Sequence, residues 1–239
     1  MLYLIGLGLN ENSITKEGTE AIKKCKKVYL ENYTVNFPYS LDKLEKISKK
    51  IIPADRDFVE GNNLIREAKK ENVALLIYGS PLTATTHISL IEEAKKNKVK
   101  YEIIYNASVF DAIAETGLQI YKFGKIASLP KWQKNFNPKS FMEIAKQNQE
   151  IDAHSLILVD ISLDLKDSLN ELEESATEYN IKLGKIILCS SLGTKDRKIF
   201  YDEVKNLREI KIKKPYCIII PSKLHFMEEE ILQNFKRII

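Results

Sequence analysis

The sequence has little cysteine or histidine, and each shortage argues against a kind of metal site; it also has only nine glycines, so each is expected to answer a need of the backbone. An odd number of cysteines without a CxxC motif suits a reducing compartment and excludes a cysteine cage for zinc. The cysteines are Cys25, Cys189 and Cys217. The histidines are His87, His154 and His225. No His-x-x-x-His spacing links them, so we expect a protein that uses no metal.

Long apolar runs and a basic domain are also missing. No run approaches the roughly 20 apolar residues that cross a bilayer. The first basic residue is Lys16 and no small-residue cleavage site follows the apolar start, so we expect a cytoplasmic protein without a membrane anchor. Basic residues outnumber acidic ones by 37 to 33, and the two halves divided near residue 107 carry 17 to 14 and 20 to 19. Because neither half is a basic module, we expect no direct nucleic-acid partner.

The chain does contain short apolar runs that alternate with segments of helical spacing. The predicted strands are 2–5, 28–31, 51–53, 73–78, 101–105, 155–161, 185–189 and 216–221. The predicted helices are 14–24, 62–70, 86–95, 141–147, 165–179 and 227–235. This alternation is typical of an α/β fold with mainly parallel sheets, whose ligands bind beyond the carboxyl ends of the strands.

The alternation breaks between Asn106 and Gly124, which predicts two domains, 1–108 and 109–239. The segment 129–138 contains prolines, asparagines and two aromatic residues, and it is predicted to be a long loop. Its basic and aromatic residues make it a candidate contact for a protein partner. The equally weighted alternative is that Trp132 packs the loop onto its own domain.

Glycines follow the first predicted strand at Gly6 and Gly8. They suggest a dinucleotide fingerprint, with Glu31 at the distance of a ribose-binding acid. However, Glu11 occupies the place of the third glycine, where its bulk and charge oppose a pyrophosphate. A tight strand-to-helix turn without a ligand is the other interpretation.

The segment Gly79–His87, with sequence GSPLTATTH, is the most unusual in the chain. It follows a predicted strand and is rich in hydroxyls and small side chains, which suits a backbone cradle for a small molecule. The alternative is an ordinary turn in which Thr85 or Thr86 caps the next helix. A hydrolase is disfavoured because Ser80 precedes a proline and lacks a nucleophile-elbow context.

Taken together, these motifs resemble the diphthine synthase family, of the tetrapyrrole-methylase-like class of S-adenosylmethionine-dependent methyltransferases. The similarity covers nearly the whole chain. The matching segments are Gly6–Leu9, Gly79–His87, Asn106–Val109, Thr116–Lys125, Leu158–Ile161 and Pro221–Glu230. There are three departures from the family pattern: Ser80 replaces an aspartate, Ser222 replaces a glycine, and the stretch Ser190–Gly193, with sequence SSLG, replaces Ala-Arg-Ala-Gly.

The resemblance implies two α/β domains with a cofactor cleft between them and a homodimeric assembly. It implies S-adenosylmethionine as cofactor, no metal, and no strong catalytic base. The cofactor contacts that it implies are Leu9, Ser80, Thr83, Ser108, Val109, Val159, Leu192 and His225. The substrate would be the amino group of a modified histidine on translation elongation factor 2, methylated toward diphthine. The alternatives are a non-catalytic binding protein that keeps the fold and a porphyrinoid methylase.

Overall fold

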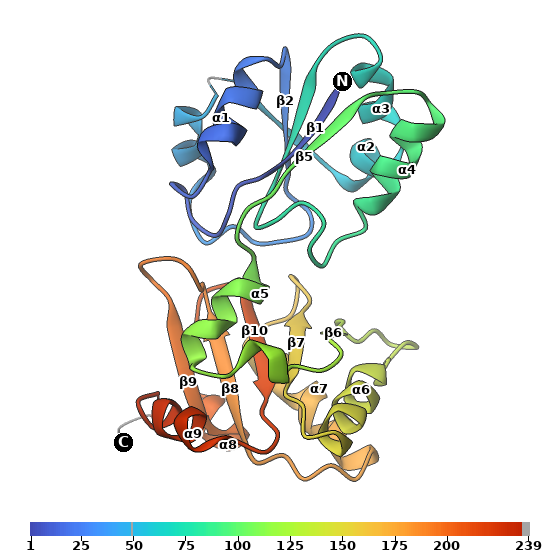
Figure 1. The fold of residues 1–239 in the computed structure, drawn as a ribbon. Helices are drawn as coiled ribbons and strands as arrows, with labels where there is room; N and C mark the ends of the chain where they lie inside the picture. Colours follow the sequence, from blue (N-terminus) through green and yellow to red (C-terminus); the bar gives the residue numbers. More distant parts are fainter. Residues whose placement is uncertain (49, 236–239) are drawn as a thin grey trace. The chain divides into compact units, whose positions relative to one another are not determined.

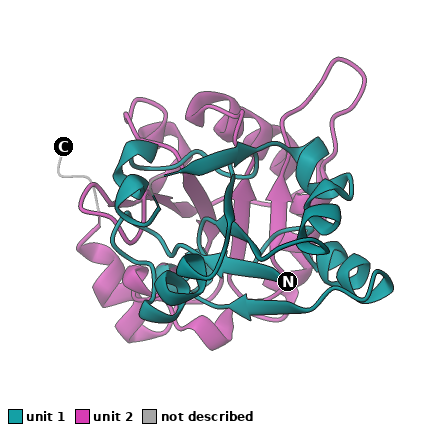
Figure 2. Ribbon diagram, turned by 90° about the horizontal axis from the view of Figure 1, so that it is seen from above, with its two compact units in different colours: residues 1–112 teal, residues 113–239 magenta. Residues whose placement is uncertain are grey.

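The computed structural model describes residues 1–48 and 50–235, and the chain divides into two compact units (Figure 1). The first unit is residues 1–112 and the second is residues 113–239, coloured separately in Figure 2. The predicted boundary between 108 and 109 precedes a short helix, α5 (Val109–Ala112), which belongs to the first unit by its contacts. The functional boundary at residue 108 stays a prediction.

The first unit is built on a five-stranded, wholly parallel sheet in the order β3-β2-β4-β1-β5. Its strands are β1 (Leu2–Gly6), β2 (Lys27–Glu31), β3 (Ile51–Ala54), β4 (Val73–Ile77) and β5 (Tyr101–Ile104). Its helices are α1 (Lys16–Lys23), the 3-10 helix η1 (Leu41–Lys46), α2 (Arg56–Glu60), α3 (Asn63–Ala68) and α4 (Ile88–Lys96).

Both faces of this sheet are buried, because successive strand residues point to opposite sides and both sets are apolar. Leu2 and Leu4 of β1 join a cluster that includes residues of α3 and α4. Tyr3 and Ile5 join a second cluster that includes Ala21 and Ile22 of α1. In Figure 1, α1 lies on one side of β1, and α3 and α4 lie on the other. Helices on both faces leave the strand ends as the accessible part of the sheet.

The second unit has a five-stranded mixed sheet in the order β6-β7-β10-β8-β9. Its strands are β6 (Ala127–Leu129), β7 (Ser155–Val159), β8 (Lys185–Ser190), β9 (Lys198–Glu203) and β10 (Tyr216–Ile220). Its helices are α6 (Ser140–Glu150), α7 (Leu165–Glu178), α8 (Val204–Leu207) and α9 (Phe226–Gln233), with 3-10 helices η2 (Ile113–Thr116) and η3 (Ile120–Lys122). Residues of α6 and α7 form one core with the sheet.

The two-domain α/β prediction is confirmed, and parallel pairing dominates the chain because the first sheet is wholly parallel. The second sheet differs from the expectation. Only β6 and β7 pair in parallel, whereas β10 is antiparallel to both its neighbours and β8 and β9 form a hairpin. The physical reason lies in the connections. A hairpin loop joins β8 to β9, which makes these two strands antiparallel. The link from β9 to β10 then carries the chain past β8, so β10 runs in the direction of β9 and pairs antiparallel with β8 between them.

Candidate functional site

Three loops meet beyond the carboxyl ends of the adjacent strands β4, β1 and β5. The N–H of Gly8 donates to the carbonyl of Gly79 at 3.1 Å, and the N–H of Gly79 donates back to Gly8 at 3.0 Å. The Asn106 side-chain amide, just after β5, donates to the carbonyls of Gly6 at 3.0 Å and Ser13 at 2.9 Å. The three motifs identified in the sequence, at Gly8, Gly79 and Asn106, are therefore parts of one hydrogen-bonded cluster.

Gly8 is required by this crossing of loops. Its φ is +70°, and a Cβ at this position would lie 2.5 Å from Cβ of Ser13 and 2.9 Å from Oδ1 of Asn106. Any side chain would therefore be strained and would clash. Gly8 is therefore explained by the packing of the loops and by a left-handed turn. A bound dinucleotide is not needed to account for it.

All five predicted contacts of the first unit are brought together by this cluster. Leu9 follows Gly8 and accepts a hydrogen bond from the Tyr78 hydroxyl at 3.1 Å. Ser80 follows Gly79, and its carbonyl accepts from the N–H of Thr83 at 3.2 Å. The position of a Cβ on Gly79 would lie 3.7 Å from Cα of Ser108. Val109 is next in the chain. Leu9, Ser80 and Ser108 are buried.

The turn that follows Ser80 is held by contacts among its own residues. The N–H of His87 donates to the Thr85 hydroxyl at 3.0 Å, and Nδ1 of the buried His87 lies 3.2 Å from the carbonyl of Pro81. His87 occupies the N-cap position of α4 without a side-chain cap bond. The alternative in which Thr85 or Thr86 caps α4 is therefore wrong, because the Thr85 hydroxyl accepts from the N–H of His87, which precedes the first helical residue Ile88.

In the second unit, Val159 and Leu192 lie at the same end of the sheet, where the strands β7 and β8 finish. Leu158 is opposite Cys217, and Ser190 is opposite Tyr216, so β7 and β8 both end beside the start of β10. Val159 is the last residue of β7, and Leu192 follows β8 and is buried. Because β10 lies between these strands, the two residues are separated by about two strand spacings, or about 10 Å.

His225 lies beyond the opposite end of the same sheet, where β7 begins. It follows the carboxyl end of β10, where Ile220 is opposite Ser155 at the start of β7. The five residues of β10 span about 17 Å, so the antiparallel strand carries His225 away from Val159 and Leu192. The resemblance grouped the three residues, whereas the sheet separates His225 from the other two.

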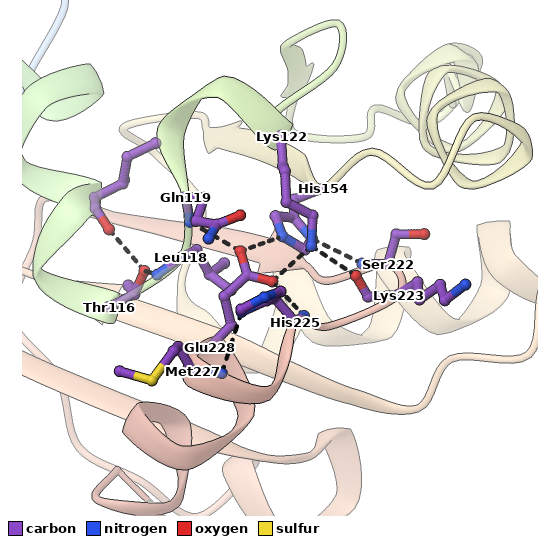
Figure 3. Close-up of polar contacts among 11 residues, drawn as sticks. Thr116, Leu118, Gln119, Lys122, His154, Ser222, Lys223, His225, Met227 and Glu228 are labelled. Carbon is purple, nitrogen blue, oxygen red and sulfur yellow. Dashed lines mark hydrogen bonds and ion pairs between the residues drawn. The ribbon is translucent and has the colours of Figure 1, made fainter.

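Around His225 the structure shows a buried polar network that the sequence alone did not single out (Figure 3). Its centre is Glu228 of α9, whose side chain is wholly buried. One carboxylate oxygen accepts from the N–H of Gln119 at 2.9 Å and lies 3.1 Å from Nε2 of His154. The other accepts from Nζ of Lys122 at 2.6 Å and from the N–H of His225 at 2.7 Å.

The network fixes the protonation of its members. Burial opposes a charge on Glu228, but hydrogen bonds from His225, Lys122, Gln119 and His154 outweigh it and lower the pKa of this carboxyl to about 2. Burial lowers the pKa of His154, and Glu228 opposes that shift only in part. The N–H of Ser222 donates to Nδ1 of His154 at 3.0 Å, so the neutral ring carries its proton on Nε2, facing Glu228.

Three further features bear on metals, membranes and thiols. In residues 1–48 and 50–235, no group of three or more His, Cys, Asp or Glu side chains is arranged to hold a metal ion. No helix of the described residues is long and apolar enough to cross a bilayer. Cys189 and Cys217, distant in sequence, are directly opposite each other on β8 and β10, and both are free thiols.

The comparisons with known proteins agree with this arrangement. Residues 1–208 match the family of Tetrapyrrole (Corrin/Porphyrin) Methylases. A crystal structure of a putative diphthine synthase from Entamoeba histolytica has a TM-score of 0.91 at 32% identity, covering 99% of this chain and 98% of that one. The fold and the strand-end loops thus define a methyltransferase of the tetrapyrrole methylase class.

Curated relatives narrow the assignment further. A diphthine synthase of Methanocaldococcus jannaschii is 38% identical over 98% of each chain. A probable diphthine methyl ester synthase of Arabidopsis thaliana is 36% identical over 99% of this chain and 98% of the relative. The chain belongs to the diphthine synthase family.

Proposed function

We propose that the protein transfers methyl groups from S-adenosylmethionine to the amino group of a modified histidine on translation elongation factor 2, forming diphthine. Membership of the diphthine synthase family supports the reaction class and the substrate. The observation that carries the cofactor assignment is the junction of the three loops at Gly8, Gly79 and Asn106, since ligands of parallel α/β sheets bind at such strand ends.

The residues at this junction fit the proposed cofactor. Leu9 and Val109 offer apolar surface of the kind that an adenine ring packs against, and Ser80 and Thr83 offer hydroxyls that can bond a ribose or an amino-acid group. Val159 and Leu192 of the second unit stay as predicted contacts. His225, which the resemblance also implies, follows the carboxyl end of β10 at the opposite strand ends of the same sheet, and its contact with the cofactor stays a prediction.

Methyl transfer from S-adenosylmethionine does not require a strong acid or base on the protein. S-adenosylmethionine supplies a methyl group already bonded to a good leaving group. The chain has to hold donor and acceptor in line and keep water out, and such positioning supplies effective molarities of about 10⁵ to 10⁸ M. The buried, backbone-rich junction at Gly8 and Gly79 is suited to this task because its hydrogen bonds are already formed.

The reaction is tested with labelled S-adenosylmethionine and elongation factor 2 that carries the unmethylated intermediate. We expect label on the substrate protein, and none on a matched factor whose acceptor histidine is replaced. Absence of label from the first substrate would refute the proposed reaction. Calorimetry with S-adenosylmethionine separates this outcome from a non-catalytic protein, which would bind neither the cofactor nor its product S-adenosylhomocysteine.

The names of the relatives differ in the product, since some specify a methyl ester. Mass spectrometry of the modified peptide counts the methyl groups transferred. Mild alkali removes a methyl ester but leaves methyl groups on nitrogen. We expect the label to resist alkali if the amine is the only acceptor, and a labile methyl group would show that a carboxylate is also methylated.

Three further properties complete the proposal: a homodimer, a cytoplasmic location and activity without metal. Sedimentation at micromolar concentration tests the first, and a monomer would contradict it. Fractionation of cells tests the second. A chelator should leave methyl transfer unchanged, and loss of activity restored by one divalent ion would overturn the third.

A further inference from the structure

The second unit contains a basic cavity that the proposed reaction does not use. It has a volume of about 490 Å³ and lies beside the loop from β8 to β9 and the segment before β10. The lining residues are Lys195, Asp196, Arg197, Lys198, Lys211, Ile212 and Lys213. Two hydrogen bonds hold these segments together. The Ser190 hydroxyl donates to the carbonyl of Lys213 at 2.6 Å, and the N–H of Ser191 donates to that of Pro215 at 2.8 Å.

The positive charge of the chain is concentrated at this place. Residues 195–198 and 211–214 contain six basic residues and one acidic residue, a net charge of +5. The whole chain has 37 basic and 33 acidic residues, so the other residues contain 31 basic and 32 acidic ones, a net charge of −1. The two segments are distant in sequence, so dividing the chain into halves could not show this concentration.

Several of these charges are available to a partner. Arg197 is paired with Glu115 at 2.6 Å, and Lys213 with Asp196 at 2.6 Å. Among the residues that the structure describes, Lys195, Lys198 and Lys211 have no ion-pair partner, and all three are exposed. Three unpaired ammonium groups around one cavity repel each other, and a negatively charged occupant relieves that repulsion.

The composition of the cavity favours carboxylates over phosphates. A phosphate site usually offers forked arginine groups or converging backbone N–H groups, but Arg197, the single arginine among the described lining residues, is held by Glu115. No aromatic side chain lines the cavity to stack on a base, as is usual for single-stranded nucleic acid. Flexible lysines around Ile212 suit acidic side chains on a protein surface with some apolar contact.

We propose that this cavity is a docking site for an acidic segment of the protein substrate. The inference rests on the proposed function for the identity of that substrate, elongation factor 2. Docking at a site apart from the strand-end junction of the first unit lets the enzyme recognise the folded protein as well as the modified histidine. Complementary charge at such a site mainly accelerates association.

The test variant combines Lys195→Glu, Lys198→Glu and Lys211→Glu, which reverses the unpaired charges. The matched control combines Lys146→Glu, Lys166→Glu and Lys182→Glu, exposed lysines of the same unit that do not line the cavity. For the test variant we expect KM for elongation factor 2 to rise about tenfold, with kcat and the affinity for S-adenosylmethionine unchanged. The control should keep the wild-type KM. Added salt should raise KM of the wild type more than that of the test variant.

Binding of elongation factor 2 to the immobilised enzyme, without cofactor, separates the two proposals. If the wild type transfers no methyl group, the proposed function fails, and loss of binding in the test variant alone still supports the docking site. An unchanged KM and unchanged binding in the test variant would overturn the docking site while methylation stands. An equal loss in the control would also overturn it. Tighter binding of a short single-stranded RNA than of elongation factor 2 would assign the cavity to nucleic acid instead.

Discussion

The buried carboxylate of Glu228 lies 3.1 Å from Nε2 of His154, although the two residues are 74 positions apart. Glu228 is on α9 and His154 directly precedes β7, so this contact ties the last helix to the sheet. The same carboxylate accepts from the N–H of His225 and so holds the start of α9 in place. Glu228 therefore joins three segments of the second unit, at Gln119, at His154 and at the start of α9.

Glu228→Ala should lower the free energy of unfolding by about 3 kcal/mol, because it leaves buried donors of Gln119, His154 and Lys122 without their acceptor. Urea denaturation measures the change. The matched control is Glu229→Ala, at the next, exposed position of α9, which should change the stability by less than about 0.5 kcal/mol. Equal effects at both positions would show that the network adds nothing.

Stability should fall in two steps as the pH decreases. Burial holds the pKa of folded His154 below its ordinary value of 6.5, so the unfolded chain takes up a proton first as the pH falls below that value. The pKa of Glu228 is lowered to about 2 from an ordinary 4.5, so its contribution is complete above 4.5 and is lost as the pH falls toward 2.

Urea midpoints measured from about pH 8 to about pH 3 separate the two steps. In His154→Gln the decrease that begins near pH 6.5 should disappear, whereas the decrease below 4.5 should remain. A variant whose stability still falls between these values would assign the first step to another group.

Ser80→Asp should strengthen binding of S-adenosylmethionine about tenfold, because a carboxylate can make a charge-assisted bond to the amino group of the ligand. Ser80 is buried at the strand-end junction, where such a bond gains strength. Calorimetry measures the affinity, and Ser89→Asp, exposed on α4, adds the same charge as a control. Unchanged or weaker binding in Ser80→Asp would show that this chain holds the cofactor by another contact.

The loop 129–138 contains two aromatic residues with different surroundings. Nε1 of Trp132 donates to the carbonyl of Pro138 at 3.2 Å, and Nζ of Lys139 lies 5.2 Å from the centre of the Trp132 ring. The side chain of Phe136 is 61% exposed. Trp132→Ala should therefore lower the free energy of unfolding by about 2 kcal/mol.

Phe136→Ala should leave the stability unchanged and raise KM for elongation factor 2, since an exposed aromatic residue is a suitable anchor for a protein partner. Methyl-transfer kinetics and thermal unfolding of both variants distinguish these roles. An unchanged KM in Phe136→Ala would remove this loop from substrate recognition.

Gly117→Ala should lower the free energy of unfolding by about 2 kcal/mol. The φ of Gly117 is +82°, and an added Cβ would lie 2.4 Å from Cγ2 of Ile231 on α9. Gly184→Ala is the matched control, because nothing lies within 4 Å of its Cβ position. Chemical denaturation compares the two, and a stable Gly117→Ala would show that α9 can shift.

Much of the architecture could be predicted because the apolar runs of the buried strands are short but uninterrupted. The strand predicted at 73–78 is β4, and the helix predicted at 165–179 is α7. In contrast, β9 has the sequence KIFYDE at a sheet edge, where charged residues are tolerated and no apolar run forms. The three residues of β6 are too few for a pattern.

A site residue could be predicted only where the same motif gave both the identity of the residue and its position in the fold. Ser80 lies three residues beyond the end of β4, so its position at the strand-end junction follows from the parallel sheet. The position of His225 depends on the direction of β10, which is set by pairing between strands distant in sequence. The role of Glu228 could not be predicted, because an acidic residue in the first turn of a helix is ordinarily a surface residue. Only the contacts of its side chain show that it is buried.

The paired glycines at the strand-end junction also limit how this sequence can change over generations. Gly8 and Gly79 bond to each other in both directions, and each has a positive φ, so a side chain at either position strains the backbone that makes these bonds. Substitutions at Ser80 and Thr83 change side chains beside the crossing without removing the backbone bonds between Gly8 and Gly79. Selection for a new ligand would act through those neighbouring side chains, with the crossing of the loops inherited unchanged.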